Sequence, residues 1–154
     1  MKKNKDLYVI CDNIRSLYNV GSIFRTSDAL GIKKIYLGGI TGTPLQLGLT
    51  KVSLGAENSV EWEPREKTSQ IITSLKKKGV QIVALELVKN KSLDINKFKP
   101  KFPLALIVGN EVEGVSSSLL KKSDDIIHIP MRGKKESLNV SVAYGIAIYK
   151  ILNK

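Results

Sequence analysis

Three short polar segments hold the residues whose types and spacing could carry out chemistry. The first covers residues 13–25, the second 109–114 and the third 129–141. Each belongs to the end of an apolar run that predicts a strand, and parallel α/β sheets bind ligands at the carboxyl ends of their strands. One His and one Cys are too few for a zinc cluster or a Cys/His nucleophilic pair. Any chemistry must therefore use carboxylates, amides, hydroxyls, guanidinium groups and the backbone, and no metal is expected.

The first segment combines amide and guanidinium side chains with one aromatic ring. Asn19 is expected to cap a helix, and Arg25 lies six residues further along, so the two side chains leave that helix on different faces. Both could still reach a cleft at the start of the helix. Tyr18, beside Arg15, could stack on a nucleobase. The alternatives are a simple cap for Asn19, a surface charge for Arg25 and ordinary packing for Tyr18.

The second segment is the turn Gly-Asn-Glu-Val-Glu-Gly at the end of an apolar run. It lacks the Lys-Ser/Thr ending of a phosphate-binding P-loop, and it does not match the dinucleotide pattern G-x-G-x-x-G. Glycines directly after a strand allow a ligand to approach the backbone closely. The alternative is a tight strand-to-helix turn whose carboxylates are solvated.

The third segment places cations ahead of two possible helix caps. Arg132, Lys134 and Lys135 surround Gly133, which predicts a flexible loop that attracts phosphate. Ser137 and Asn139 stand just before a strongly apolar stretch, where either could simply be the N-cap of a helix.

Short β-rich runs alternate with helical patterns along the chain, which is typical of an α/β domain with a largely parallel sheet. Strands are expected at 7–12, 33–39, 81–87, 104–109 and 125–130. Helices are expected at 19–31, 64–78, 115–123 and 139–152, with a loop at 40–55 that has room for one short helix. No repeat or linker divides residues 1–154, so a single domain is expected.

The last expected helix is apolar around much of its circumference, so it should be buried on more than one side. In so small a domain, the second side is expected to belong to another subunit, which predicts a homodimer through the C-terminal helix. A charged residue in place of Ile148 or Ile151 would weaken such a dimer if that side faces the partner.

The amino-acid composition indicates the cellular location of the protein and the class of its binding partner. Twenty-five Lys and Arg against fourteen Asp and Glu give 25 − 14 = +11, so the surface should attract polyanions such as nucleic acid, although a merely solubilising surface is the alternative. The single Cys cannot form an internal disulfide, and the first apolar run is too short for a signal peptide. No stretch approaches the ~20 apolar residues of a membrane span. A cytoplasmic location is expected.

Taken together and in order, the three segments resemble the motifs of the SpoU (TrmH-like) family of RNA ribose 2′-O-methyltransferases, within the SPOUT class. The first motif, N-x-G-x-x-x-R, is matched by Asn19, Gly21 and Arg25. The second, an apolar strand followed by G-x-E-x-x-G, is matched by Gly109, Glu111 and Gly114. The third is matched by Ile-Pro-Met at 129–131 and Ser-Leu-Asn-Val-Ser at 137–141. The match covers nearly the whole chain.

This resemblance implies an α/β, parallel-sheet SPOUT-type domain with a C-terminal deep trefoil knot, acting as a dimer on RNA with S-adenosyl-L-methionine. No separate RNA-binding domain is expected beside it, so the basic surface or a partner would recognise the RNA. The implied cofactor-binding residues are Leu85, Glu86, Gly109, Asn110, Gly114, Ile129, Met131 and Leu138. The implied catalytic residues are Arg25, Asn19, Glu111, Ser137 and Asn139, and those for the RNA are Arg15, Tyr18, Arg132, Lys134 and Lys135.

Other functions stay open beside this interpretation. A non-catalytic RNA-binding or ribosome-assembly protein could keep the same fold without turnover. A nicotinamide dehydrogenase is disfavoured, because the G-x-G-x-x-G pattern is missing. Among RNA substrates, tRNA is favoured over rRNA, because compact members of the family often act on tRNA.

Overall fold

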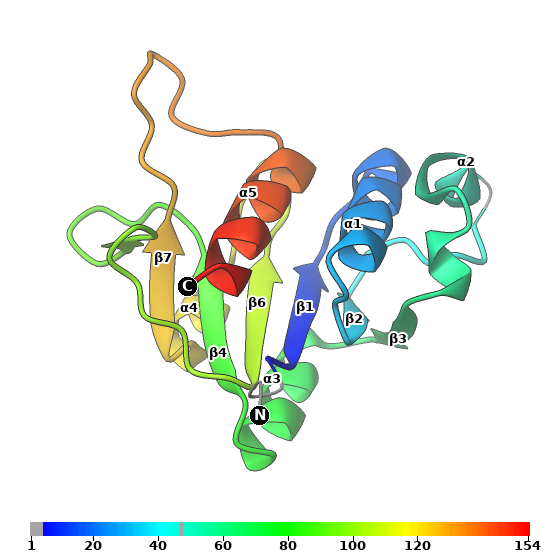
Figure 1. Cartoon of the computed structure of the whole chain (residues 1–154), viewed down its shortest axis with the longest axis horizontal. Helices are drawn as coiled ribbons and strands as arrows, with labels where there is room; N and C mark the ends of the chain where they lie inside the picture. Colours follow the sequence, from blue (N-terminus) through cyan, green and yellow to red (C-terminus); the bar gives the residue numbers. More distant parts are fainter. Residues whose placement is uncertain (1–4, 47) are drawn as a thin grey trace.

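A computed structural model describes residues 5–46 and 48–154, and its described strands form a single parallel sheet (Figure 1). The sheet has seven strands in the order β3-β2-β1-β6-β4-β7-β5. Their bounds are β1 Leu7–Asp12, β2 Lys34–Gly38, β3 Glu61–Arg65, β4 Gln81–Leu85, β5 Leu93–Asp94, β6 Leu104–Val108 and β7 Asp125–His128. Every neighbouring pair is parallel, which confirms the predicted α/β class.

Helices cover both faces of the sheet, which explains why its central strands are apolar on both sides. Every residue of β6 is buried. One face packs against α1 (Leu17–Ala29) and α5 (Val140–Leu152), the other against α3 (Thr68–Lys77) and α4 (Ser117–Lys122). After β2 the chain forms α2 (Leu49–Ser53) and a short 3-10 helix, Ala56–Asn58. In the described part of the chain, no helix combines the length and apolarity needed to cross a membrane.

The predicted cap of the first helix is wrong. Helix α1 begins at Leu17, and Ser16 is its N-cap, accepting a hydrogen bond from the Asn19 backbone N–H at 3.2 Å. Asn19 therefore lies inside the first turn, and its side chain is released from capping. The predicted stop is close to the observed one, because the C-cap is Leu30 and Gly31 follows in the left-handed region.

Two strands were not predicted from the sequence, and both lie at edges of the sheet. β3 carries charges on alternate residues and contains Pro64, so its sequence suggested the start of a helix. An edge strand tolerates both features, because one of its sides needs no hydrogen-bonding partner. The following helix accordingly begins at Thr68, later than predicted. β5 has two residues and pairs only with β7, so no periodicity could reveal it.

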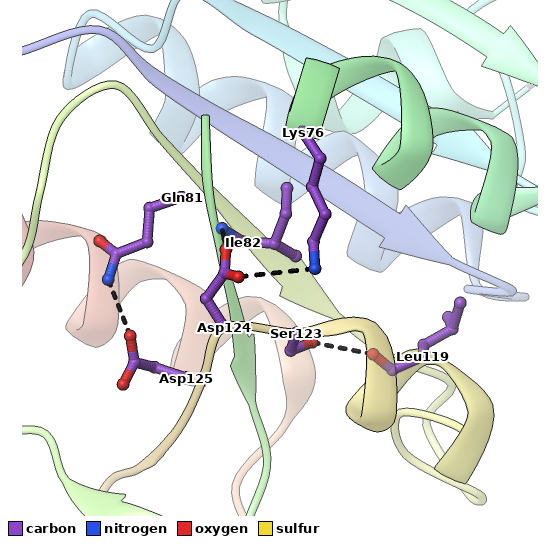
Figure 2. A network of polar contacts seen from close by, with 7 residues as sticks. All are labelled: Lys76, Gln81, Ile82, Leu119, Ser123, Asp124 and Asp125. Atoms are coloured by element: carbon purple, nitrogen blue, oxygen red, sulfur yellow. Dashed lines mark hydrogen bonds and ion pairs between the residues drawn. The ribbon is translucent and has the colours of Figure 1, made fainter. Parts of the chain in front are cut away.

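The start of β7 is fastened to β4 by a network of polar contacts (Figure 2). One Asp124 carboxylate oxygen accepts a hydrogen bond from the buried Ile82 N–H at 2.8 Å, and the other lies 3.5 Å from Lys76 Nζ. Gln81 Nε2 donates to the Asp125 carboxylate at 2.8 Å. These contacts fix the register of β7, so that β1, β6, β4 and β7 all end at the same edge of the sheet.

Helix α5 is buried on the side predicted for the partner. Ile148 and Ile151 are fully buried within their own chain, so the expectation that their side of the helix faces a partner is wrong. The apolar residues that α5 leaves exposed are instead Val142, Ile146 and Tyr149. The helix therefore does have a second apolar side, at different positions from those expected.

Candidate active site

A cavity of about 460 Å³ opens at the carboxyl ends of β4, β6 and β7. This volume lies within the range of small-molecule sites. The cavity brings together all the residues predicted to hold the cofactor, Leu85, Glu86, Gly109, Asn110, Gly114, Ile129, Met131 and Leu138. Glu111, Ser137 and Asn139 also line it. Segments that are far apart in the sequence thus meet where the strands end.

The turn between β6 and α4 requires glycine at both ends. A Cβ on Gly109 would lie 2.4 Å from the carbonyl carbon of Gly114, so the backbone could not close on itself. Gly114 has φ +69°, and a Cβ there would lie 2.1 Å from a carboxylate oxygen of Glu86. That oxygen accepts a hydrogen bond from the Val115 N–H at 2.9 Å. Glu86 therefore holds the turn in place, and the cavity has bare backbone along this wall.

A chain of side-chain hydrogen bonds joins the three polar segments. The Glu111 carboxylate accepts from the backbone N–H groups of Arg15 at 3.1 Å and Ser16 at 3.0 Å, and from Asn19 Nδ2 at 3.1 Å. Asn19 Oδ1 in turn accepts from Asn139 Nδ2 at 3.1 Å. Asn139 Oδ1 caps α5, accepting from the N–H of Ser141 at 2.9 Å. The buried Asn19 amide is thus the junction between the turn after β6 and the start of α5.

The electrostatics of Glu111 follow from these contacts. Partial burial raises the pKa of its carboxyl group, but the hydrogen bonds from Ser16, Asn19 and Arg15 outweigh burial and leave the pKa below its ordinary value. The charged form is favoured because every one of these partners is a donor. The carboxylate also sits at the N-terminus of α1, where the helix dipole favours negative charge.

Several predicted site residues do not line this cavity. Arg25 is exposed on α1, about 9 Å along the helix axis from Asn19. Arg15 and Tyr18 are exposed at the start of α1. Arg132 lines a different groove, beside α5. Lys134 and Lys135 are exposed in the loop that leads to α5.

His128 is one of several lining residues that were given no role from the sequence. His128, the last residue of β7, lines the cavity, and its Nδ1 lies 2.8 Å from Ser92 Oγ. Its position at the carboxyl end of a strand was the available signal. No group of three or more His, Cys, Asp or Glu side chains within residues 5–46 and 48–154 could hold a metal ion.

The parallel sheet and the cavity at its carboxyl edge define an α/β protein of the kind that holds ligands at the strand ends. The model of the SpoU rRNA Methylase family matches residues 6–149, so the chain belongs to this family. A tRNA (guanosine(18)-2′-O)-methyltransferase of Aquifex aeolicus is 37% identical over 151 residues, which cover 97% of this chain and 70% of the relative. YacO of Bacillus subtilis, named for the TrmH family, is 29% identical over 99% of this chain and 61% of its own length.

Solved structures agree with this assignment. The AdoMet-bound rRNA methyltransferase of Sinorhizobium meliloti superposes with a TM-score of 0.90 at 30% identity, over 96% of this chain. The TrmH/SpoU tRNA modifying enzyme of A. aeolicus superposes with a TM-score of 0.87 at 36% identity, over 99% of this chain and 76% of that chain. The present chain spans only 56% of the S. meliloti chain, so that relative contains additional residues.

Replacing Glu111 by Gln should destabilise the fold in a pH-dependent way. The pKa of Glu111 is lower in the folded than in the unfolded state, so its stabilisation is present above the unfolded pKa of about 4.3 and is lost as pH falls through the folded pKa. We expect a loss of about 1 kcal/mol at pH 7, since the group is partly exposed, shrinking below pH ~4. Urea unfolding from pH 3 to 8 measures this difference.

Glu113→Gln is the matched control, because the Glu113 side chain accepts no hydrogen bond among those of the described residues. A Glu111→Gln loss that stays constant down to pH 3, or equals that of the control, would contradict the assignment.

Proposed function

We propose that this protein transfers a methyl group from S-adenosyl-L-methionine to a ribose 2′-hydroxyl of structured RNA in the cytoplasm. The observation that carries the proposal is the glycine-walled cavity joined to the Glu111–Asn19–Asn139 chain. The names of the relatives support it, because they are methyltransferases of tRNA or rRNA. The net charge of +11 supports an RNA substrate through attraction for phosphate.

The volume and the lining of the cavity suit the cofactor. When bound, S-adenosyl-L-methionine supplies a methyl group that is already activated. Apolar side chains of Leu85, Ile129 and Leu138 would hold its adenosine, and the backbone of the 109–114 turn would meet its polar groups. The turn suits this role because Gly109 and Gly114, which both line the cavity, have no side chain to cover their backbone.

The residues of the chain must orient the 2′-hydroxyl and reduce the cost of losing its proton. Glu111 is a poor candidate for the base, because three donors already share its carboxylate. We assign it and Asn19 to positioning. Ser137 and Asn139, at the start of α5, are assigned to the ribose. Arg25 is assigned to the phosphate of the target nucleotide, since a guanidinium with a pKa above ~12 is a reluctant base.

A turnover assay distinguishes the proposed enzyme from the alternative, a non-catalytic RNA-binding protein. The purified protein is incubated with labelled cofactor and total RNA from a strain lacking the gene, and the 2′-O-methylated nucleotides are mapped. Methylation of a tRNA is expected, in line with the named activity of the A. aeolicus relative.

In this assay Arg25→Ala should slow single-turnover transfer by ~100-fold or more, because it loses a charge-assisted contact worth about 3 kcal/mol.

Calorimetric cofactor binding should be unchanged in Arg25→Ala, because Arg25 does not line the cavity. Arg25→Lys should restore only part of the rate, since an ammonium lacks the planar fork of a guanidinium. Lys78→Ala, which removes an exposed cation from the end of α3, is the control. Near-normal transfer by Arg25→Ala would remove this residue from the mechanism.

We also propose a homodimer formed through α5. Of its exposed apolar residues, Ile146 and Tyr149 line a groove of about 740 Å³ that continues over Leu30 of α1 and Pro130. The third, Val142, lies four residues before Ile146 on the same helix. Such a continuous apolar surface is typical of an interface between subunits.

Ile146→Asp should weaken association of the two subunits at least tenfold, measured by sedimentation equilibrium at micromolar concentration. Leu54→Asp, at an exposed apolar position on α2's C-cap, should leave it unchanged. A monomeric wild type would exclude the dimer.

A deep trefoil knot is proposed from the order of threading. The chain leaves α4 on one face of the sheet and reaches α5 on the other. It crosses as β7, which lies between β4 and β5 although these two strands are consecutive in sequence. This order supports the inference that β7 passes through the loop leading from β4 by way of β5 to β6, an arrangement that most folds avoid.

Optical-tweezer stretching tests the knot. The denatured chain, pulled from its two ends, should stay shorter than its contour of roughly 3.5 Å per residue, because the knot tightens. Pulling between residues 5 and 104 leaves the threaded segment outside the stretched part, and should reach the full contour. Full extension in both geometries would exclude a knot.

A further inference from the structure

A second cavity, of about 640 Å³, lies on the other side of the 109–114 turn. Asn110, Glu111, Val112 and Glu113 line both cavities, so four residues form a wall between them. The opposite wall consists of Asn13, Arg15 and Ser16 from the β1–α1 connection and Ile40 from the loop after β2. Nothing in the function proposed above uses this space, although it adjoins the site where the methyl group would be transferred.

The second cavity is held open by hydrogen bonds between its three loops. Asn110 Nδ2 donates to the Asn13 carbonyl at 2.8 Å, and Asn110 Oδ1 accepts from the N–H of Val112 at 2.9 Å. Asn13 Oδ1 accepts from the Ile40 N–H at 3.0 Å. Asn13 itself adopts a left-handed backbone with φ +53°, which Asn tolerates better than most residues. The cavity is therefore preformed, as ligand sites commonly are.

The lining combines exposed apolar surface with acceptors. Val112 is 93% exposed and Ile40 is 61% exposed, so both present aliphatic surface to water beside the cavity. Glu111 and Glu113 oppose the single cation Arg15, and this balance disfavours a phosphate group. Aliphatic contacts suit the flat face of a nucleobase. Since Glu111 already accepts three hydrogen bonds, the Glu113 carboxylate is the group that would accept from the N–H edge of the base.

We propose that this second cavity receives the unstacked base of the nucleotide that is methylated. The inference rests on the proposed function and adds a base site to it. Enzymes that act on one nucleotide of a folded RNA commonly draw its base out of the stack and hold it in a pocket. Placing the base on one side of the 109–114 turn brings its ribose to the edge of the wall, next to the cofactor cavity on the other side.

Ile40→Glu tests the proposal, because Ile40 lines only the second cavity and its exposed side chain is not needed for packing. A carboxylate there should repel the RNA and lose the aliphatic contact. We expect kcat/KM for RNA to fall at least about tenfold, with cofactor affinity by calorimetry and the melting temperature unchanged. Leu45→Glu is the matched control, since Leu45 is 86% exposed, lies outside this cavity and receives the same change in charge.

A crosslinking measurement adds an independent readout. With p-benzoylphenylalanine in place of Ile40, ultraviolet light should join the protein to the same nucleotide whose ribose is methylated in the mapping experiment. Crosslinks confined to other nucleotides, or equal rates for Ile40→Glu and Leu45→Glu, would overturn the base site while the methyltransferase function stands. If the wild type methylates no RNA, the proposed function fails and the base site fails with it.

Discussion

One carboxylate organises the polar edge of this protein. Glu111 belongs to the turn after β6, yet its oxygens accept hydrogen bonds from the start of α1, 95 residues earlier in the chain. The same chain of hydrogen bonds continues from Asn19 to Asn139, which lies 120 residues after Asn19 in the sequence. Backbone N–H groups at a helix start need an acceptor, and an ionised carboxylate is a strong one. Loss of this acceptor would leave the N–H groups of Arg15 and Ser16 and the Asn19 amide without their shared partner.

The glycine turn is the second constraint, and it follows from the first. Glu111 can reach α1 only if the backbone from Gly109 to Gly114 folds back tightly, which no residue with a Cβ allows at either end. The same tight turn is thin enough to be the wall of two cavities. A structural requirement of the backbone therefore also brings the two cavities close together, as the proposed transfer of a methyl group between two bound molecules would require.

Helix α5 links the site to the rest of the fold. Its N-cap, Asn139, belongs to the hydrogen-bond chain of the site, while its buried side packs against the sheet and α1. Its remaining exposed apolar residues form the face that we propose for a partner subunit.

The sequence alone determined the α/β class and five of the seven described strands, because buried parallel strands are continuous apolar runs. The residues that gather in the cavity came instead from the resemblance of three motifs to the SpoU family, and they do lie where strands end. It could not determine that Ser16 rather than Asn19 caps α1, since that depends on Glu111 arriving from a distant turn. Local residue patterns equally failed to predict the edge strands β3 and β5 and the side of α5 that stays exposed. The buried face of an apolar helix and the pairing of polar groups are decided only when distant segments pack together. The reason is that local residue types set the preference for a helix or a strand, whereas tertiary contacts determine which other segment each side chain meets.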